Sequence, residues 1–277
     1  MTHPNLLLIG CGKMGGALLS GWLANGWPKT GVCIVEAHTP TREAWAQQGL
    51  TAVADPLEIP AEFIPAAVLI AVKPQALDLA LPPVARRIAA LCGAKPPLVI
   101  SIVAGKPIAA FEAAFGKHAP VLRVMPNTPA AVGRGISGLY ANPGVTKAQK
   151  GLGQTLLGAV GQVVWLDDED QIHAVTALSG SGPAYVFHLV EAMAKGGVAL
   201  GLPPEVAMTL ARATVVGAGE LMHRSPDDAA TLRVNVTSPG GTTAAALDVL
   251  MHPGEGFPEL LPRALAEAAR RSRELAG

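Results

Sequence analysis

The chain begins with an apolar run, a glycine-rich loop, a helical segment and a second apolar run. Leu6–Ile9 leads into the loop Gly-Cys-Gly-Lys-Met-Gly at 10–15, and Val32–Val35 follows the helical segment Gly16–Asn25. In a dinucleotide-binding unit the first glycine makes a tight turn, the second lets the backbone approach a pyrophosphate, and the third packs helix on strand. The start of the helix adds partial positive charge. Because strands flank the loop on both sides, the pattern favours a cofactor site over a turn with a purely steric role.

The residue that follows the second apolar run bears on the choice of cofactor. Glu36 lies about 20 positions after the last loop glycine, where such folds place an acid that hydrogen-bonds the adenosine ribose. A carboxylate there repels a 2′-phosphate and favours NADH. Side chains that would instead hold this phosphate and favour NADPH are His38, Thr39, Thr41 and Arg42. The sequence leaves this choice open, and it also leaves open that Glu36 is only a capping or surface carboxylate.

Apolar runs alternate with alanine-rich segments through residues 1–166. This alternation predicts an α/β fold with a mostly parallel sheet that helices cover on both faces. Gln75–Leu91 is one of the predicted helices. The further predicted strands are Val68–Val72, Leu98–Val103, Val121–Val124, Ile136–Ala141 and Val163–Leu166. We therefore expect residues 1–166 to form a Rossmann-type NAD(P)-binding domain.

Strand signals end near Asp167, and helical segments follow. The predicted helices are Asp168–Leu178, Ala184–Leu200, Pro204–His223, Thr242–Met251 and Pro258–Leu275. In the second of these, apolar residues recur at helical spacing and form a stripe: Phe187, Val190, Ala194 and Val198. A domain this small would bury such a stripe poorly by itself, which favours association with a second copy. We expect residues 167–277 to form an all-α dimerisation domain.

Composition argues against several classes of protein. The 21 Lys+Arg residues balance the 21 Asp+Glu residues, so no basic field attracts a nucleic acid. Apolar runs such as Val68–Val72 are far shorter than the roughly 20 residues that a membrane-spanning helix needs. The three cysteines, Cys11, Cys33 and Cys92, lack metal-ligand spacing and suit a reducing compartment. We expect a cytoplasmic protein with no metal, no nucleic-acid partner and no membrane span.

Two loops follow predicted strands at the edge where open α/β sheets bind ligands. The first reads Ala-Val-Lys-Pro-Gln at 71–75. Its Lys73 either faces the cofactor or holds a strand-end carbonyl. The second, Met125–Ala130, contains two prolines and is either a rigid crevice wall or a rigid connector.

Two segments of the helical half are unusual. Thr176–Tyr185 contains two glycines, two serines and a proline, which disfavour a regular helix. It is either a place of close approach to a ligand or a partner subunit, or a kink between helices. Val236–Thr243 ends in Gly-Gly-Thr-Thr at the start of a helix, where free amides and hydroxyls form a nest for a small carboxylate. A plain N-cap explains one threonine but not the whole string.

Together these segments resemble the pyrroline-5-carboxylate reductases, which catalyse the last step of proline biosynthesis. The resemblance covers nearly the whole chain. Its most specific part is Leu232–Leu250, which reads Leu-Arg-Val-Asn-Val-Thr-Ser-Pro-Gly-Gly-Thr-Thr before an alanine-rich helix. It implies a Rossmann-type domain followed by a helical domain that interleaves with a second subunit, in dimers or rings of dimers. The active site would lie where the two domains and two subunits meet.

The resemblance also implies roles for individual residues. Thr176 matches the hydroxyl near the imine nitrogen and is the expected catalytic residue. The substrate carboxylate is expected on Ser238, Gly240, Gly241, Thr242 and Thr243. The expected cofactor contacts come from the two loops and the acid after the second strand: Gly10, Cys11, Gly12, Lys13, Met14, Gly15, Glu36, Ala71, Val72, Lys73 and Pro74. The family varies at the position of Glu36, so its cofactor preference is not carried over.

The implied reaction is hydride transfer from NADH or NADPH to C5 of 1-pyrroline-5-carboxylate, which gives L-proline. A protonated cyclic imine is already electrophilic, so positioning is the main task and supplies roughly 7–11 kcal/mol. The Thr176 hydroxyl would hydrogen-bond the ring nitrogen and pass a proton from water, a contribution of about 10²-fold. No strong base is needed, and the histidines are read as surface or loop residues (His3, His118, His223, His252) or helix-face residues (His173, His188).

Two other functions compete with this interpretation. A β-hydroxyacid dehydrogenase has a similar domain plan but needs a base, usually a lysine on the interdomain helix. Residues 176–194 contain no lysine, and Lys195 lies beyond the glycine and proline string. The second alternative is a non-catalytic NAD(P)-binding dimeric regulator, which would bind NADH tightly without turning it over.

Overall fold

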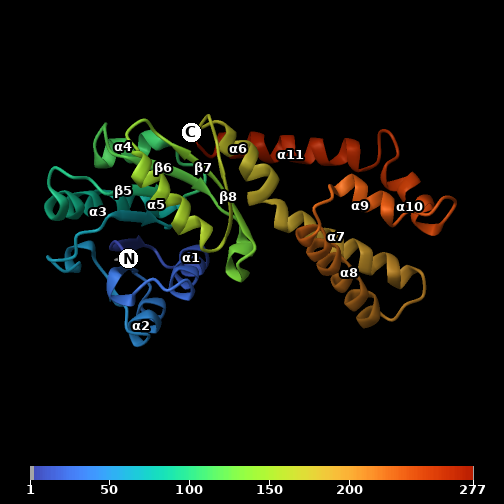
Figure 1. Cartoon of the computed structure of the whole chain (residues 1–277), viewed down its shortest axis with the longest axis horizontal. Coiled ribbons are helices and arrows are strands. Elements are labelled where there is room, and N and C mark those ends of the chain that lie inside the picture. Colours follow the sequence, from blue (N-terminus) through green and yellow to red (C-terminus); the bar gives the residue numbers. More distant parts are fainter. Residues whose placement is uncertain (1–2, 277) are drawn as a thin grey trace. The chain divides into compact units, whose positions relative to one another are not determined.

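The computed structural model describes residues 3–276 and divides into two compact units (Figure 1). The sheet unit contains the chain up to Gly180 together with the residues from Ala269 onward, and the helical unit is Ser181–Ala268. The sheet unit therefore extends past residue 166, where we predicted the first domain to end, and includes the carboxyl end of the chain. The two units are described separately below.

The sheet unit is built on an eight-stranded sheet of order β3-β2-β1-β4-β5-β6-β7-β8. Strands β1 to β6 are parallel, β7 runs antiparallel to β6, and β8 is parallel to β7. This confirms the predicted α/β fold with a mostly parallel sheet. The strands are β1 (Leu6–Ile9), β2 (Val32–Val35), β3 (Thr51–Val53), β4 (Ala67–Ile70), β5 (Leu98–Ser101), β6 (Val121–Met125), β7 (Gly135–Ala141) and β8 (Gly161–Trp165).

Helices cover both faces of the sheet, because the inner strands are apolar on both sides. Along β1, Leu6 and Leu8 belong to one core cluster, and Leu7 and Ile9 belong to the other. The first cluster lies under α1 (Lys13–Ala24) and α5 (Lys147–Gly158), and the second lies under α3 (Leu77–Cys92) and α4 (Ile108–Phe115). The short α2 (Thr39–Gln47) follows β2.

The last helical segments of the sheet unit differ from the prediction. We expected one helix over Asp168–Leu178, but α6 spans only Gln171–Val175, and a π-helical turn follows at Thr176–Gly180. The wider i→i+5 turn places one extra residue in the helix, and such turns occur frequently at functional sites.

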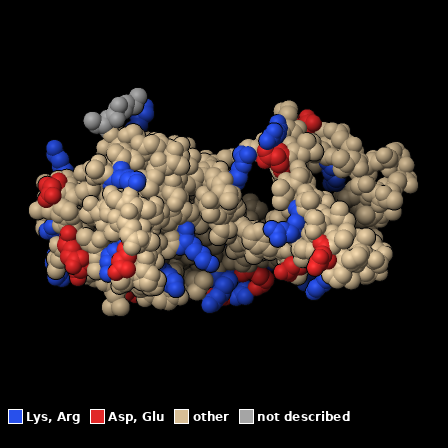
Figure 2. Space-filling view, turned by 90° about the horizontal axis from the view of Figure 1, so that it is seen from below, with Lys and Arg blue, Asp and Glu red and all other residues tan. Residues whose placement is uncertain are grey.

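The helical unit contains α7 (Gly182–Ala199), α8 (Pro204–Arg224), α9 (Ala229–Asn235), α10 (Thr242–Leu250) and the first part of α11 (Phe257–Glu274). Helices α7 and α8 pack closely: a Cβ on Gly197 would lie 3.1 Å from the Ala207 methyl. Within the single chain, many large apolar side chains of these helices stay exposed, among them Phe187 (64%) and Val216 (71%). On the face shown in Figure 2, acidic and basic side chains are interspersed rather than gathered in one patch.

Candidate functional site

The three glycines of the 10–15 loop have different surroundings. Gly10 has a φ of +85°, and a Cβ there would lie 3.0 Å from the carbonyl oxygen of Ala71. A Cβ on Gly15 would overlap the carbonyl oxygen of Gly10, whereas a Cβ on Gly12 would meet no atom of the described chain within 4 Å. Gly10 therefore makes the tight turn, Gly12 leaves room for a ligand to approach the backbone, and Gly15 allows close packing of the helix. A dinucleotide-binding loop needs these three roles.

Helix α1 starts directly in this loop. Gly12 is its N-cap, and within the described residues no side chain caps it. The first N–H groups of a helix have no partners inside the helix, and the helix dipole adds positive charge to them. The backbone at 13–15 can therefore donate hydrogen bonds to the pyrophosphate of NAD(P)H, and the residues present fit this cofactor.

Glu36 connects the glycine loop to the loop that precedes α2. Its Oε2 accepts the N–H of Cys11 at 2.7 Å, and its Oε1 accepts the N–H of His38 at 2.8 Å. Both oxygens still have lone pairs, which could accept ribose hydroxyls. Glu36 thus fixes two backbone segments at the carboxyl end of β2, and its contact with the ribose stays a prediction.

The residues that we predicted as a phosphate-binding alternative do lie together. Arg42 donates from Nη1 to the carbonyl oxygens of Glu36 (2.9 Å) and Ala37 (3.2 Å), and from Nη2 to Thr39 Oγ1 (3.2 Å). His38 Nδ1 and Thr41 Oγ1 are 2.8 Å apart. The guanidinium thus holds the loop that precedes α2 through the backbone carbonyls of Glu36 and Ala37. Binding of a 2′-phosphate at this cluster stays a prediction.

The 71–74 segment lies beside the glycine loop. The N–H of Ala71 donates to the carbonyl of Ile9 at 2.8 Å, and a Cβ on Gly10 would lie 3.1 Å from Val72 Cγ1. Lys73 then caps a 3₁₀ turn over Pro74–Ala76. We predicted a helix that begins at Gln75, but α3 begins at Leu77. Pro74 is instead the first residue of the preceding 3₁₀ turn, a position that proline suits.

Sequence reasoning missed the loop after β5, which lies next to this segment. The N–H of Ile102 donates to the carbonyl of Ile70 at 3.1 Å, and the buried Ser101 Oγ accepts the N–H of Val103 at 3.2 Å. The sequence did contain a signal for this loop, because it follows an apolar strand just as the 71–74 segment does. The 102–107 loop therefore lies beside the 71–74 segment, at the same edge of the sheet.

The Met125–Ala130 loop contacts the π-helical turn that contains Thr176. Asn127 is 8% exposed; its Nδ2 donates to the carbonyl of Ser179 at 3.2 Å, and its Oδ1 accepts the N–H of Ile136 at 2.9 Å. The Thr176 hydroxyl donates to the carbonyl of Ile172 at 2.7 Å. The proton of this hydroxyl is thus engaged by the backbone, and its oxygen lone pairs can accept a hydrogen bond.

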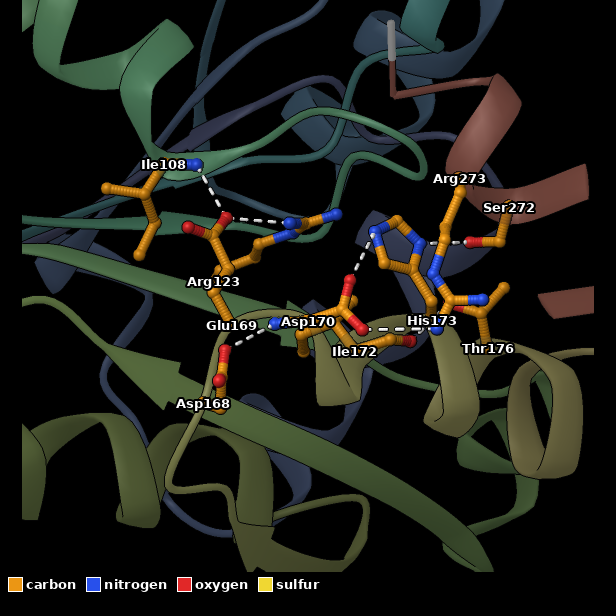
Figure 3. A network of polar contacts seen from close by, with 10 residues as sticks. All are labelled: Ile108, Arg123, Asp168, Glu169, Asp170, Ile172, His173, Thr176, Ser272 and Arg273. Atoms are coloured by element: carbon orange, nitrogen blue, oxygen red, sulfur yellow. Dashed lines mark hydrogen bonds and ion pairs between the residues drawn. The ribbon is translucent and has the colours of Figure 1, made fainter. Parts of the chain in front are cut away.

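A polar network lies beside this turn (Figure 3). Arg123 on β6 donates to Glu169, the His173 ring bonds Ser272 at 2.8 Å, and Arg273 pairs with Asp170 at 3.1 Å. His173, which we read only as a helix-face residue, is buried. Burial lowers the pKa of His173 below its ordinary 6.5; the positive charge of Arg123 lowers it further, while Asp170 acts in the opposite direction.

The thiol of Cys11, in the glycine loop, is expected to be unreactive. Burial raises the pKa of Cys11 to about 12, and the nearby Glu36 carboxylate adds to this effect. The thiol stays protonated and is a poor nucleophile and metal ligand. Across the described residues, no group of three or more His, Cys, Asp or Glu side chains is placed to hold a metal ion. In residues 3–276 no helix has the length and apolarity to cross a membrane.

In the helical unit, the Gly-Gly-Thr-Thr string forms the start of α10. Gly240 has a φ of +67°, and the N–H of Gly241 donates to the carbonyl of Ser238 at 3.0 Å. Gly241 is the N-cap, and among the described residues no side chain caps the helix. Neither threonine is therefore the N-cap of α10, which was the simpler explanation of this string. Thr242 and Thr243 lie in the first turn, where backbone N–H groups are free for an anion.

Comparisons with known proteins agree with these features. A family model described as pyrroline-5-carboxylate reductase dimerisation matches residues 169–275, and one described as NADP oxidoreductase, coenzyme F420-dependent, matches residues 5–105. The pyrroline-5-carboxylate reductase of Pseudomonas aeruginosa is 43% identical over 284 residues, covering 100% of this chain and 98% of that protein. The one from Arabidopsis thaliana is 36% identical over 96% of this chain and 94% of that protein.

Solved structures give the same answer. The structure of a pyrroline-5-carboxylate reductase from Coxiella burnetii matches with a TM-score of 0.90 at 34% identity, over 99% of both chains. The Plasmodium falciparum pyrroline carboxylate reductase, solved with NADP bound, matches with a TM-score of 0.82 at 27% identity, over 100% of both chains. At 43% identity over its whole length to one pyrroline-5-carboxylate reductase, and with a dimerisation-family match over residues 169–275, this chain belongs to the pyrroline-5-carboxylate reductase family.

Proposed function

We propose that this protein reduces 1-pyrroline-5-carboxylate to L-proline with NADH or NADPH, the last step of proline biosynthesis. The observation that carries the proposal is that two helices in one chain of this family, α1 and α10, each begin at a glycine N-cap with no side-chain cap among the described residues. The start of α1 suits a dinucleotide pyrophosphate, and the start of α10 suits a small carboxylate. The reaction class is oxidoreduction of a cyclic imine.

The sheet unit would hold the cofactor. When bound, the reduced nicotinamide supplies the hydride. The residues that would hold NAD(P)H belong to the glycine loop, the end of β2 and the loop after β4: Gly10, Cys11, Gly12, Lys13, Met14, Gly15, Glu36, Ala71, Val72, Lys73 and Pro74. The close contact of Ala71 with Gly10 supports this set, because it joins two of its segments.

The helical unit would seat the substrate carboxylate on Ser238, Gly240, Gly241, Thr242 and Thr243. Free amides and hydroxyls at the first turn of α10 match the charge of a carboxylate. Holding the imine in one orientation converts a bimolecular encounter into an effectively unimolecular step, which is worth roughly 7–11 kcal/mol. No strong base or metal has a required role in this chemistry.

Thr176 would position the imine nitrogen. Because its hydroxyl proton is donated to the Ile172 carbonyl, the Thr176 oxygen acts as an acceptor. The protonated imine carries an N–H donor that suits such an acceptor. The substrate therefore brings its own proton to the nitrogen, and Thr176 holds the charged form in place.

The working form would be a homodimer in the cytoplasm, with assembly into a ring of dimers as a further step. The exposed apolar side chains of α7 and α8 support association, because a second copy would remove them from water. The three free cysteines are in keeping with a reducing compartment.

The two rival functions are less well supported. A β-hydroxyacid dehydrogenase needs a base, and α7 reaches its first lysine, Lys195, only near its carboxyl end. A regulator that binds NAD(P)H without turnover would not need a second anion nest at the start of α10.

The deciding experiment measures oxidation of NADH and NADPH with 1-pyrroline-5-carboxylate and identifies proline as the product. The Thr243→Ala variant should raise the KM for the imine much more than the KM for the cofactor. An equal rise in both constants would reject the substrate assignment. Tight cofactor binding without proline formation would favour the regulator.

A further inference from the structure

The carboxyl end of α11 is held by three contacts inside the sheet unit. Ser272 Oγ lies 2.8 Å from His173 Nδ1, and both residues are 6% exposed. Arg273 Nη2 donates to Asp170 Oδ2 at 3.1 Å. The carbonyl oxygen of Leu275 lies so close to Gly105 that a Cβ there would approach it to 2.9 Å. Helix ends often fray, whereas the last turn of α11 is held by a buried side-chain hydrogen bond.

These contacts reach two different segments that lie beside the proposed site. Gly105 is part of the 102–107 loop, which is hydrogen-bonded through Ile102 to the end of β4, immediately before Ala71. Asp170 and His173 belong to the segment that leads directly into the π-helical turn of Thr176 (Figure 3). The end of α11 therefore contacts both the 102–107 loop and the segment that carries the Thr176 turn.

The local chemistry indicates that these contacts set geometry. Gly105 has a φ of +73°, a conformation that side-chain-bearing residues rarely adopt, so the loop curves toward the helix end. The Ser272–His173 hydrogen bond is buried, and its loss would leave an unpaired polar group, which costs more than an exposed bond would. By contrast, Arg273 and Asp170 form an exposed pair that contributes little to overall stability.

We propose that residues 272–275 are a positioning clamp, which fixes the 102–107 loop and the Thr176 turn relative to each other. The proposal rests on the proposed function, because it concerns how the reductase site is held. Loosening the clamp should lower turnover while leaving the binding of the adenosine half of the cofactor unchanged, since Glu36 and the glycine loop make none of these contacts.

The test compares four variants of the full chain by hydrogen exchange without cofactor and by steady-state kinetics. Ser272→Ala removes the hydroxyl and Ser272→Thr keeps it. A chain ending at Glu274 removes the Gly105 contact together with the last two backbone hydrogen bonds of the helix end, and it keeps the side chains of Ser272 and Arg273. Arg86→Ala, an exposed arginine of α3, controls for a surface change. For Ser272→Ala we expect faster exchange at 171–180 and 102–107 and about a tenfold lower kcat, with the KM for NADPH within about twofold. Ser272→Thr should restore both.

The shortened chain separates the two arms of the clamp: it should raise exchange at 102–107 and leave 171–180 unchanged. Exchange unchanged in both segments of Ser272→Ala would overturn the proposal, and so would an increase spread over the whole sheet unit, which indicates general destabilisation. A wild-type protein that does not reduce the imine would refute the proposed function, while the exchange data would still report on the clamp.

Discussion

A single carboxylate oxygen of Glu169 accepts the Arg123 guanidinium at 2.6 Å and the backbone N–H of Ile108 at 2.8 Å (Figure 3). The Arg123 side chain is 4% exposed and that of Glu169 is 29% exposed. Ile108 is the first residue of α4, so the carboxylate also places negative charge at a helix start. Glu169 thus ties β6, α4 and the segment before α6 together.

Removing the two partners should have unequal effects. Glu169→Ala leaves the Arg123 charge buried and unpaired, and we expect a loss of about 3–5 kcal/mol in the free energy of unfolding. Arg123→Leu leaves Glu169 able to rehydrate and to keep the Ile108 N–H, so we expect a loss of roughly 1–3 kcal/mol. Urea denaturation of both variants measures the difference. Equal losses would show that the burial of Arg123 is not what makes the pair important.

Among the inner strands, β1 and β2 could be predicted to the residue, whereas the predicted bounds of β4, β5 and β6 differ from the observed ones by one or two residues. Leu6–Ile9 and Val32–Val35 are continuous apolar runs, because parallel inner strands pack on both sides. The edge strand β3 was missed, because its three residues, Thr51–Val53, are partly exposed and carry no apolar run. Helix α9 was missed because its seven residues are too short for a periodic pattern.

The stability of the sheet unit should depend on pH through His173. Its pKa is lowered in the folded protein, so below about 6.5 the unfolded chain binds more protons than the folded one. Stability is therefore unaffected by this group above pH 6.5 and falls as the pH drops from 6.5 toward the folded pKa. Asp170, whose pKa is lowered from 3.8 by its hydrogen bond to Arg273, contributes only at lower pH.

The His173→Asn variant isolates this effect. Asparagine keeps a polar atom near Ser272 but does not titrate. Between pH 7.5 and 5.5, the free energy of unfolding should decrease more in the wild type than in the variant. The measurement is urea denaturation at both pH values. Identical decreases would mean that other groups cause the acid sensitivity.

The glycine loop offers a matched pair of substitutions. Gly12→Ala introduces a methyl into unoccupied space, so the melting temperature should stay within a few degrees of the wild type while the Kd for NADPH rises by about tenfold or more. Gly15→Ala forces a methyl onto the Gly10 carbonyl and should cost about 1–3 kcal/mol of stability. NADPH fluorescence titration and thermal unfolding distinguish the two. Unchanged cofactor affinity in Gly12→Ala would remove this loop from the cofactor site.

The charge of Glu36 should set the preference between NADH and NADPH. Two unit charges about 4 Å apart in water repel by about 1 kcal/mol, so Glu36→Gln should lower the Kd for NADPH relative to NADH by about fivefold. The ratio is the right measure, because loss of one carboxylate oxygen also weakens the hold on Cys11 and His38 for both cofactors. Glu43→Gln, an exposed acid on α2, makes the same charge change as a control. A ratio equal in both variants would contradict a role for Glu36 in discrimination.

The glycine loop was predictable because its three roles depend on neighbours in sequence. The hydrogen bond between His173 and Ser272 was not, since no local pattern links an alanine-rich carboxyl end to a histidine 99 residues earlier. The π-helical turn could be predicted only in part. The glycines and serines after Thr176 indicated an irregular helix, but the i→i+5 register depends on packing, including that of Met125 against Gly180.

The Thr176 hydroxyl should matter for turnover and not for folding. Thr176→Ala removes the oxygen that would accept the imine N–H, and we expect kcat to fall by about 10–10²-fold with the melting temperature and the Kd for NADPH nearly unchanged. Thr176→Ser keeps the hydroxyl and should retain most of the activity. Ser179→Ala is the control, because the Ser179 hydroxyl makes the same kind of bond, to the Val175 carbonyl at 3.0 Å, on the same turn. Equal losses in Thr176→Ala and Ser179→Ala would assign the hydroxyl to the structure of the turn, and an unchanged kcat in Thr176→Ala would remove it from the reaction.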